Sequence, residues 1–245
     1  PHEKDFLGLQ LVPSKLLNKD IIDVGANFGQ STVSFRKIGF IKNKIFLFEA
    51  NCELFIRLNK IKKNFKKIFI FRFGLSNKNK NEVIYIPEIK NIRLTPLASL
   101  NIKSLKNQLK VQFPNNFKNF KIKKREVKLK KFDSLKLSIK PSIIKIDVEG
   151  HEHEVISGMK NLISLHKPLL LVEYNKVNFV KIYTQLKKDY SVYLYFFYLK
   201  RFKKFSKKTL IQFYKKNTKF HDIQKPRNIY FISKKLEKKI KYKIC

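Results

Sequence analysis

Tryptophan is absent from this chain of 245 residues, and cysteine occurs only twice, as Cys52 and Cys245. Two cysteines exclude the disulfide framework that supports small secreted proteins, so we expect a reducing, cytoplasmic setting. The lack of tryptophan does not leave the chain short of bulky core material, because 23 Phe and 10 Tyr supply it. A chain of this length is long enough for one domain with a full hydrophobic core.

Long apolar runs are also lacking. The longest, such as Tyr190 to Leu199, cover about ten residues, which is too short for a helix that spans a bilayer. No secretory signal is visible. Because the chain starts at Pro1 and not at Met, we expect it to be a fragment in which residues 1–19 lead into a single domain over residues 20–245.

Acidic residues are scarce: 18 Asp and Glu stand against 55 Lys and Arg, for a net charge of +37. Such a charge suits nucleic acid or an anionic membrane surface as a partner. Lys far outnumbers Arg, however, and abundant Lys, Asn, Ile and Phe are what an AT-rich coding sequence produces. Because Arg is the better reader of bases, the charge indicates compositional drift or nonspecific contact with anionic surfaces before nucleic-acid binding.

Glycine is scarce too, with seven in the chain, and two of these fall in the segment from Asp23 to Ser31. An apolar pair, Ile21-Ile22, precedes the segment and an amphipathic run follows it, which is the order strand, turn, helix. No Gly-Lys-Ser/Thr follows the turn, which excludes a P-loop. The third glycine of the Gly-x-Gly-x-x-Gly dinucleotide turn is missing as well.

The residues present in this turn favour a cationic ligand. Gly25 and Gly29 let the backbone turn tightly and approach a ligand that a Cβ would exclude. The start of the following helix offers unpaired N–H groups, and Asp23 puts a carboxylate at a strand end, where open α/β sheets bind ligands. A carboxylate disfavours a triphosphate, whereas S-adenosylmethionine carries ammonium and sulfonium groups. The alternative is a plain glycine turn in a parallel α/β protein.

A second acid, Glu49, ends an apolar segment that starts at Lys44 and is typical of a buried strand. Glu49 lies 26 positions after Asp23, close to the roughly 20-residue spacing at which an acidic residue meets a ribose in βαβ nucleotide sites. A carboxylate accepts two hydrogen bonds from a vicinal diol, which favours a ribose over a phosphate. An exposed acid at a strand end is the alternative for Glu49 taken alone.

Ionisable groups crowd the end of a third apolar strand, which begins at Ser142. Asp147, Glu149, His151 and Glu152 fall in one turn, and an apolar-periodic helix follows. Like charges so close raise the pKa of at least one carboxylate, and such clusters tend to mark functional sites. The alternative makes the two glutamates helix-start acids that the helix dipole favours.

The residue spacing argues against a metal site in this segment. His151 and His153 are two positions apart, so on a helix their side chains point in different directions. No cysteine lies near them in the sequence to complete a ligand set. We therefore expect no metal ion here.

Four separated motifs occur in one order between about Asp20 and Glu173. They are Asp-Val-Gly-Ala-Asn-x-Gly-x-Ser, Phe-Glu-Ala-Asn, Gly-Leu-Ser and Ile-Lys-Ile-Asp-Val-Glu-Gly-His-Glu. Together they resemble the FkbM family of S-adenosylmethionine-dependent methyltransferases. The resemblance implies an α/β, Rossmann-like class I methyltransferase fold, with a seven-stranded, mostly parallel sheet, an antiparallel last strand and helices on both faces. It also implies O-methylation of a hydroxyl on a sugar, a glycan or a small-molecule natural product.

The resemblance further implies which residues hold S-adenosylmethionine. The glycine turn would hold the methionine part and Glu49 the ribose, and residues 74–76 would lie near the adenine. The implied cofactor-binding residues are Asp23, Gly25, Ala26, Asn27, Gly29, Ser31, Glu49, Ala50, Leu75 and Ser76. Ala50 departs from the family pattern, in which proline is frequent, but Glu49 is retained.

Apolar runs that alternate with amphipathic helices also indicate a mostly parallel sheet covered on both faces. The predicted strands are 20–24, 44–49, 67–73, 82–86, 142–147, 168–174, 191–197 and 228–233, the last two forming an antiparallel pair. The predicted helices are 30–38, 52–62, 152–164 and 176–188. Two segments interrupt the alternation. Residues 87–125 are interpreted as a lid over the acceptor site or a disordered insertion, and residues 200–227 as a basic, aromatic connector.

The candidate catalytic residues are Asp147, Glu149 and His151. For transfer of a methyl group from a sulfonium to a hydroxyl, the protein must orient the oxygen and remove its proton. His151 is attractive because its unperturbed pKa is near neutrality, but which of the three is the base stays open. Glu173, at the end of its own strand, is a further candidate on the acceptor side, or is only structural.

Three functions stay open from the sequence. The first is an O-methyltransferase whose partner is a small-molecule or glycan acceptor. The second, suggested by the charge, is a nucleic-acid methyltransferase, but the Asn/Asp-Pro-Pro-aromatic tetrapeptide of base N-methylating enzymes is absent. The third is a non-catalytic binding module that keeps the fold, and the intact cofactor motifs count against it.

Overall fold

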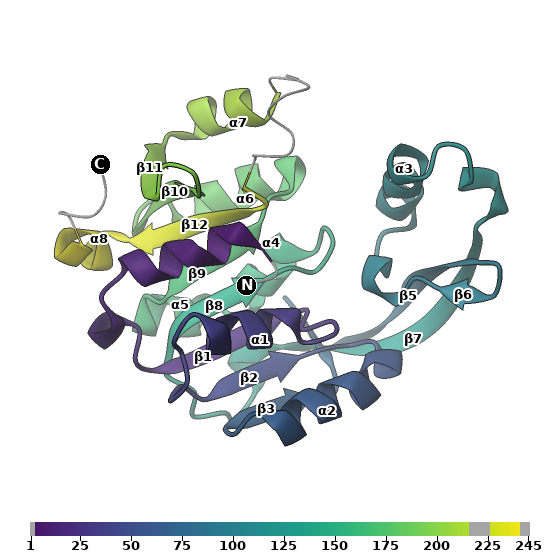
Figure 1. The fold of residues 1–245 in the computed structure, drawn as a ribbon, viewed down its shortest axis with the longest axis horizontal. Coiled ribbons are helices and arrows are strands. Elements are labelled where there is room, and N and C mark those ends of the chain that lie inside the picture. The colour runs from purple at the N-terminus through teal and green to yellow at the C-terminus, as the bar shows by residue number, and fades with distance from the viewer. Residues whose placement is uncertain (1–2, 216–225, 241–245) are drawn as a thin grey trace.

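Eight strands form the central sheet in the computed structural model, which describes residues 3–215 and 226–240 (Figure 1). In spatial order they are β11 (Arg201–Phe205), β10 (Tyr190–Phe196), β12 (Asn228–Ser233), β9 (Leu169–Glu173), β8 (Pro141–Ile146), β1 (Asp20–Val24), β2 (Ile45–Phe48) and β3 (Ile68–Phe71). The five strands from β9 to β3 run parallel. As expected for the last strand of the chain, β12 is antiparallel to both of its neighbours.

The predicted count of seven strands is wrong by one, because β11 adds an eighth strand beside β10. This strand lies within residues 200–227, for which the sequence predicts a connector. Its sequence, Arg-Phe-Lys-Lys-Phe, carries the charges of a protected edge strand, and of its five residues only Phe202 is buried. Helix α7 (Lys207–Lys215) follows it, and residues 216–225 of the connector lie outside the described residues.

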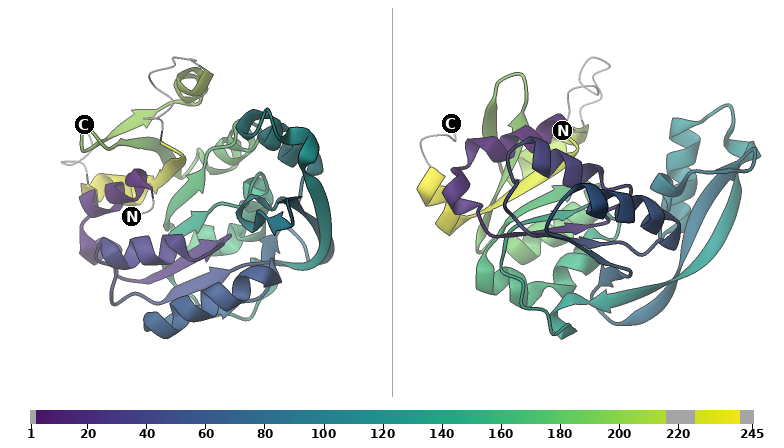
Figure 2. Two further views of the ribbon diagram at one scale, coloured as in Figure 1. Left: turned by 45° about the vertical axis from the view of Figure 1, so that its right-hand side comes forward. Right: turned by 60° about the horizontal axis from the view of Figure 1, so that its bottom comes forward.

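Apolar side chains on both faces of the parallel strands explain why these strands read as continuous apolar runs. In β8, Ile143 packs into the core on one face and Ile144 into the core on the other. The Ile144 face is covered by α4 (Glu152–Gly158), α5 (Lys160–His166), α6 (Lys176–Leu186) and α7. The Ile143 face is covered by η1 (Lys4–Leu11), α1 (Gln30–Lys37), α2 (Phe55–Asn64) and α8 (Lys234–Ile240). Helices therefore lie on both faces, as expected (Figures 1 and 2).

A second sheet projects from one end of the first (Figure 2). Its strands, in spatial order, are β4 (Gly74–Ser76), β7 (Lys121–Lys131), β5 (Lys80–Ile89) and β6 (Ile92–Arg93), and α3 (Ile102–Gln112) accompanies them. We call this sheet and α3 the arm. A small core of its own holds the arm together, with Ile84 and Ile86 of β5 packed on Val127 and Leu129 of β7.

The arm accounts for two of the sequence predictions. The strand predicted at residues 82–86 is part of β5, so it belongs to the arm and not to the main sheet. Residues 87–125 contain β6, α3 and the adjoining ends of β5 and β7. The alternation of β7 is hidden because its buried positions are separated by lysines. The role of residues 87–125 as a lid stays a prediction.

Some helices differ in detail from the predicted spans. The helix predicted over residues 152–164 is two helices, α4 and α5, which meet at Met159. The helix predicted from residue 52 begins with a turn of 3-10 helix, η3 (Cys52–Leu54), before α2. The other short 3-10 helices are η2 (Ser14–Leu16), η4 (Thr95–Leu97), η5 (Phe117–Asn119) and η6 (Phe132–Ser134). Over the described ranges, no helix has the length and apolar character needed to cross a membrane.

Candidate functional site

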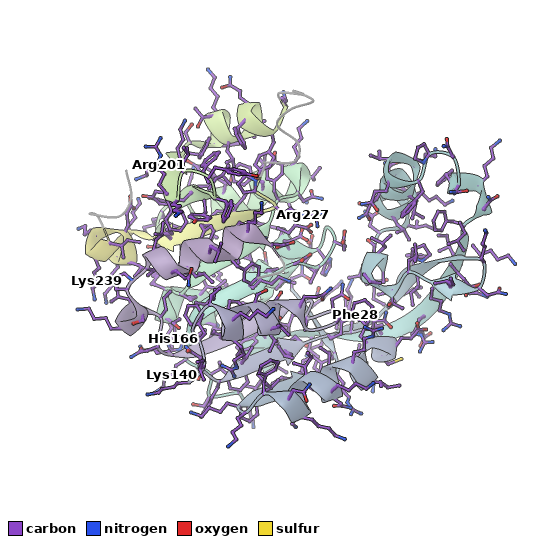
Figure 3. All side chains as sticks on the ribbon, viewed as in Figure 1. Phe28, Lys140, His166, Arg201, Arg227 and Lys239 are labelled. Atoms are coloured by element: carbon purple, nitrogen blue, oxygen red, sulfur yellow. The ribbon has the colours of Figure 1, made fainter. Side chains whose placement is uncertain are left out.

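A pocket of about 280 Å³ lies at the carboxyl ends of β1, β2, β8 and β9. The arm covers it with residues of β5, β7 and η4. Figure 3 shows Phe28 and Arg227 at this end of the sheet, and Lys140, His166 and Lys239 at the opposite end. Open parallel sheets bind their ligands at the carboxyl ends of the strands, so this pocket is the candidate site.

Most of the site residues predicted from the sequence line this pocket. Those that line it are Gly25, Ala26, Asn27, Ser31, Glu49, Ala50, Leu75, Asp147, Glu149 and His151. Three other predicted residues do not line the pocket. Asp23 is fully buried, and Gly29 packs so closely on Ile61 of α2 that a Cβ would contact it. Ser76 is hydrogen-bonded to His151, which does line the pocket. The structure therefore gathers these residues in one region, and their roles in binding stay predictions.

The glycines of the turn are required by packing inside the protein. Gly25 has a φ of +75°, and a Cβ there would lie 1.9 Å from the backbone oxygen of Asp147. Gly29 has a φ of +81°, and its Cβ would lie 2.8 Å from Cγ1 of Ile61. Asn27 also has a positive φ, of 50°, which asparagine tolerates better than most residues. The turn can thus lie against the loop after β8, which brings Asp147 to the pocket.

Glu49 is held in place by the backbone around it. Its Oε2 accepts a hydrogen bond from the N–H of Asn27 at 2.9 Å, and its Oε1 accepts one from the N–H of Asn51 at 2.8 Å. Burial raises the pKa of the Glu49 carboxyl, and the backbone N–H groups of Asn51, Asn27 and Ala50 oppose that rise. A carboxylate has about four lone-pair sites, so it can accept a further hydrogen bond. A fixed carboxylate with this capacity fits a vicinal diol.

Two unpaired polar atoms lie beside Glu49. Nδ2 of Asn51 and Oδ1 of Asn27 are buried without a hydrogen-bond partner among residues 3–215 and 226–240, and both residues line the pocket. Buried polar groups are nearly always hydrogen-bonded, so a donor and an acceptor left open indicate a ligand with polar groups of both kinds. S-adenosylmethionine, with its ribose, amino and carboxylate groups, fits this donor and acceptor set.

A buried lysine lies between two carboxylates, one behind the pocket wall and one at its lining. Lys145 of β8 is 2% exposed, and its Nζ lies 3.6 Å from Oδ1 of Asp23 and 3.2 Å from Oδ2 of Asp147. Burial alone would lower the pKa of Lys145, but the two carboxylates outweigh burial and raise it. Burial raises the pKa of Asp23 to about 6 despite the attraction of Lys145. The ammonium group therefore compensates part of the buried negative charge.

Three carboxylates lie close together where β8 and β9 end. Asp147, Glu149 and Glu173 each offer an oxygen within 4.8 Å of the others, a spacing that could hold a metal ion. Burial, followed by the charge of Asp147, raises the pKa of Glu149 to about 7. The same two causes raise the pKa of Glu173 well above its usual value. The carboxyl of Glu149 is thus poised to exchange a proton near neutral pH.

Hydrogen bonds to a buried glutamate hold the loop that carries Glu149. Glu149 has a φ of +50° and Gly150 a φ of +97°. A positive φ at a residue that is not glycine costs of order 1 kcal/mol or more and persists only where its surroundings hold it. Glu152 supplies that hold, because its Oε1 accepts hydrogen bonds from the N–H groups of Val148 at 3.3 Å and Gly150 at 2.9 Å. Glu152 is fully buried, so it supports the loop and does not face the pocket.

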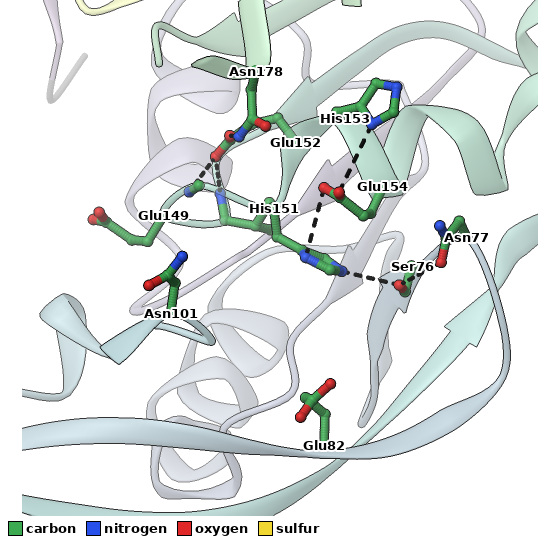
Figure 4. A network of polar contacts seen from close by, with 12 residues as sticks. Ser76, Asn77, Glu82, Asn101, Glu149, His151, Glu152, His153, Glu154 and Asn178 are labelled. Atoms are coloured by element: carbon green, nitrogen blue, oxygen red, sulfur yellow. Dashed lines mark hydrogen bonds and ion pairs between the residues drawn. The ribbon is translucent and has the colours of Figure 1, made fainter. Parts of the chain in front are cut away.

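The side chain of His151 points away from Glu149 and toward Ser76 (Figure 4). Its Nε2 lies 2.9 Å from Oγ of Ser76, and its Nδ1 lies 3.7 Å from Oε2 of Glu154. His153 turns to the same glutamate, with its Nδ1 3.8 Å from Oε1. Burial lowers the pKa of His151. The imidazole is therefore mainly neutral at pH 7 and tied to the arm through β4.

Some residues that line the pocket, or contact a residue that lines it, have little or no signal in the local sequence. Glu3 and Arg227 come from opposite ends of the chain and meet here because β12 lies beside β9. Gln108 of α3 reaches across from the arm, where its Nε2 donates to Oε2 of Glu149 at 3.4 Å. Lys145 had a detectable signal, because a lysine in the middle of an apolar, fully buried strand needs a charged partner.

The chain matches a family model and is similar to solved structures. The family model described as the methyltransferase FkbM domain matches residues 23–200. Among solved structures, the chain is similar to methyltransferase FkbM from Methylobacillus flagellatus, at 14% identity and a TM-score of 0.52, over 86% of this chain and 43% of that one. It is also similar to precorrin-6y C5,15-methyltransferase from Geobacter metallireducens, at 12% identity and a TM-score of 0.41, over 93% of this chain and 85% of that one. No curated protein matches.

These comparisons carry different weight. The chain spans less than half the length of the Methylobacillus structure, and at 14% identity the likeness concerns the fold alone. The family model, in contrast, covers most of the chain and includes the turn at Gly25, Glu49 and the loop at Asp147. This chain belongs to the FkbM methyltransferase family.

Proposed function

We propose that this chain is an S-adenosylmethionine-dependent O-methyltransferase that acts on a hydroxyl group of a sugar, a glycan or a small natural product. Membership of the family supports methyl transfer. The finer assignment is supported by the pocket, where residues suited to a nucleoside and residues suited to proton transfer line one cavity.

Residues at the ends of β1 and β2 would hold the cofactor. Glu49 would accept hydrogen bonds from the ribose hydroxyls, and Nδ2 of Asn51 would donate one. The first turn of α1, beginning at Gln30, has no side-chain cap, which leaves its N–H groups available to a carboxylate. When bound, S-adenosylmethionine supplies an electrophilic methyl group whose transfer breaks a carbon–sulfur bond.

Glu149 is the residue best suited to take the proton of the acceptor hydroxyl. Its pKa of about 7 lies near neutrality, where a general base works best. Asp147, with its oxygen 3.2 Å from the Lys145 ammonium, is suited to orient the hydroxyl by accepting a hydrogen bond. His151 is already engaged with Ser76, so we propose that it positions the loop and does not remove the proton.

One observation carries the proposal: Glu49, suited to a ribose, and the group Asp147, Glu149 and Glu173, suited to proton transfer, line a single pocket. Incubation with methyl-labelled S-adenosylmethionine and a panel of sugars tests it. We expect label on a sugar hydroxyl with the wild type, and a rate lower by about 10²–10⁴-fold with Glu149→Gln, the usual contribution of a general base.

A matched variant separates this loss from a general effect of charge. Glu126→Gln removes one carboxylate from an exposed position of β7 outside the pocket, and we expect it to transfer methyl groups like the wild type. Equal rates for Glu149→Gln and Glu126→Gln would contradict Glu149 as the base. A wild type that binds S-adenosylhomocysteine but labels no hydroxyl compound would contradict O-methylation.

A further inference from the structure

Acidic residues gather in the pocket more than composition explains. Among residues 3–215 and 226–240, five acids line it against two Lys and Arg, although the full sequence has 18 acids and 55 Lys and Arg. The acids are Glu3, Glu49, Asp147, Glu149 and Glu173, and the bases are Lys145 and Arg227. A protein with a formal net charge of +37 therefore contains a pocket whose described lining residues have a formal negative charge. Compositional drift toward lysine does not produce this contrast.

The two bases do not balance the acids. The lining residues have a formal excess of three negative charges, and a cofactor with one net positive charge would still leave two. Lys145 is already placed between Asp23 and Asp147. The side chain of Arg227 is 74% exposed at the rim, 3.8 Å from Glu3. Glu149 and Glu173 lie close together, and a positive charge beside them would favour the ionised forms that burial and the charge of Asp147 disfavour.

We propose that the acceptor supplies this charge: it is a hydroxyl compound that also carries a protonated amine, such as an amino sugar. The inference rests on the proposed function, because it names the acceptor of the same pocket. Glu173 would bind the ammonium group, which donates three hydrogen bonds, and Glu149 would receive the neighbouring hydroxyl. Oxygens of the two carboxylates lie within 4.8 Å of each other, a spacing that a vicinal amino alcohol can bridge.

A divalent metal ion is the other occupant with the right charge. It would use Asp147 together with the two glutamates. Oδ2 of Asp147 lies 3.2 Å from the ammonium group of Lys145, so a metal ion bound to that carboxylate would be placed against a positive charge. An amine on Glu173 leaves the pair of Lys145 and Asp147 intact, and the geometry favours it for that reason.

Three sugars with the same ring and different charge test the proposal: methyl glucoside, methyl 2-amino-2-deoxyglucoside and methyl glucuronide. Their binding to the complex with S-adenosylhomocysteine is measured by ligand-observed NMR at about pH 7, where the amine is still largely protonated and the pKa of Glu149 is near enough for an ammonium group to favour the ionised carboxylate. The salt concentration is ~0.15 M, to screen the basic surface. We expect the amino sugar to bind about tenfold tighter than the glucoside, as charge-assisted hydrogen bonds allow. The glucuronide should bind most weakly.

Variants locate the preference in the pocket. Each of two single variants, Glu173→Gln and Glu149→Gln, should reduce the preference for the amino sugar to about threefold or less. Glu126→Gln should preserve the preference. Equal binding of the three sugars, binding of none, or preference for the glucuronide would overturn the inference. So would a preference that requires added magnesium chloride and disappears with EDTA, since a metal ion would then fill the cluster. The proposed function predicts that S-adenosylhomocysteine binds in all of these samples. If it binds but the sugar preference is missing, the further inference fails and the proposed function does not; if S-adenosylhomocysteine itself does not bind, the proposed function fails.

Discussion

Replacement of Lys145 by methionine should make the stability of the protein strongly dependent on pH. The lysine is 2% exposed and lies between Asp23, which is fully buried, and Asp147. Methionine has a similar length and no charge, so Lys145→Met removes the cation and leaves the two carboxylates without it. Removing one partner of a buried ion pair is costly because the remaining charge is left uncompensated.

The pKa of Asp23 sets the size of the effect. It already rises from 3.8 to about 6, and at ~1.4 kcal/mol per pKa unit this shift costs about 3 kcal/mol of stability once the carboxyl is ionised. Without Lys145 the pKa rises further. At pH 7 the additional cost from Asp23 is limited to about 1.4 kcal/mol, because the carboxyl then stays protonated. The partly exposed Asp147 adds a smaller amount, so we expect a total of ~2 kcal/mol at pH 7.

The sign of the pH dependence follows from the raised pKa. A carboxyl whose pKa is higher in the folded state favours folding most at low pH, and this contribution is lost as pH rises through the folded pKa. In the wild type the loss from Asp23 is complete a little above pH 6, whereas in Lys145→Met it continues beyond pH 7. The two proteins should therefore unfold at similar temperatures near pH 5 and diverge above pH 6.

Thermal unfolding followed by calorimetry tests this reasoning. We expect Lys145→Met to lower Tm by about 4–8 °C at pH 7, at roughly 2–4 °C per kcal/mol for a chain of this size, and by about 2 °C or less at pH 5. Lys60→Met, which removes an exposed lysine from α2, should show no such difference between the two pH values. An equal loss for Lys145→Met at both pH values, or no loss at pH 7, would refute the argument.

Three further predictions concern the chemistry and the packing of the site. The kcat/KM for methyl transfer should rise with pH through about 7 as Glu149 loses its proton, and Glu149→Gln should abolish that limb of the profile. Asp147→Asn should lower turnover by about 10²-fold or more while calorimetry shows unchanged binding of S-adenosylhomocysteine; full turnover would remove Asp147 from the catalytic set. Gly158→Ala should lower Tm in a thermal scan, although alanine normally stabilises a helix by about 0.5–1 kcal/mol, because its Cβ would lie 1.9 Å from the backbone oxygen of Ser76. A raised Tm would show that α4 and β4 can separate without cost.

The parallel part of the fold is predictable from the sequence because its strands are buried on both faces. Residues such as Ile143 and Ile144 pack into different cores, so the strands appear as short apolar runs between glycine turns and amphipathic helices. β7 and β11 are not predictable in this way because few of their residues are buried and charged residues dominate both strands. In β7 only Val127 and Leu129 are buried among eleven residues, and the rest are largely lysine.

The candidate site was predictable where motifs lie at the ends of consecutive parallel strands. Asp23, Glu49 and Asp147 each follow or end an apolar run, and their strands are neighbours in the sheet. Contributions from distant segments were not predictable in this way. The pairing of β12 with β9 brings Arg227 to the pocket, and Nδ2 of Asn228 holds Glu3 beside it by donating to Oε2 at 2.6 Å; no local pattern specifies either contact.

Binding of S-adenosylhomocysteine, measured by calorimetry, tests the central claim most directly. The account predicts micromolar or tighter binding to the wild type, and binding about 10–100-fold weaker to Glu49→Gln, because hydrogen bonds to a charged group contribute about 1.5–3 kcal/mol. Glu53→Gln, which changes an acid of η3 paired with Arg93 and Arg125, should bind like the wild type. No binding to folded wild-type protein, or equal binding to Glu49→Gln, would contradict the assignment of this pocket to the cofactor.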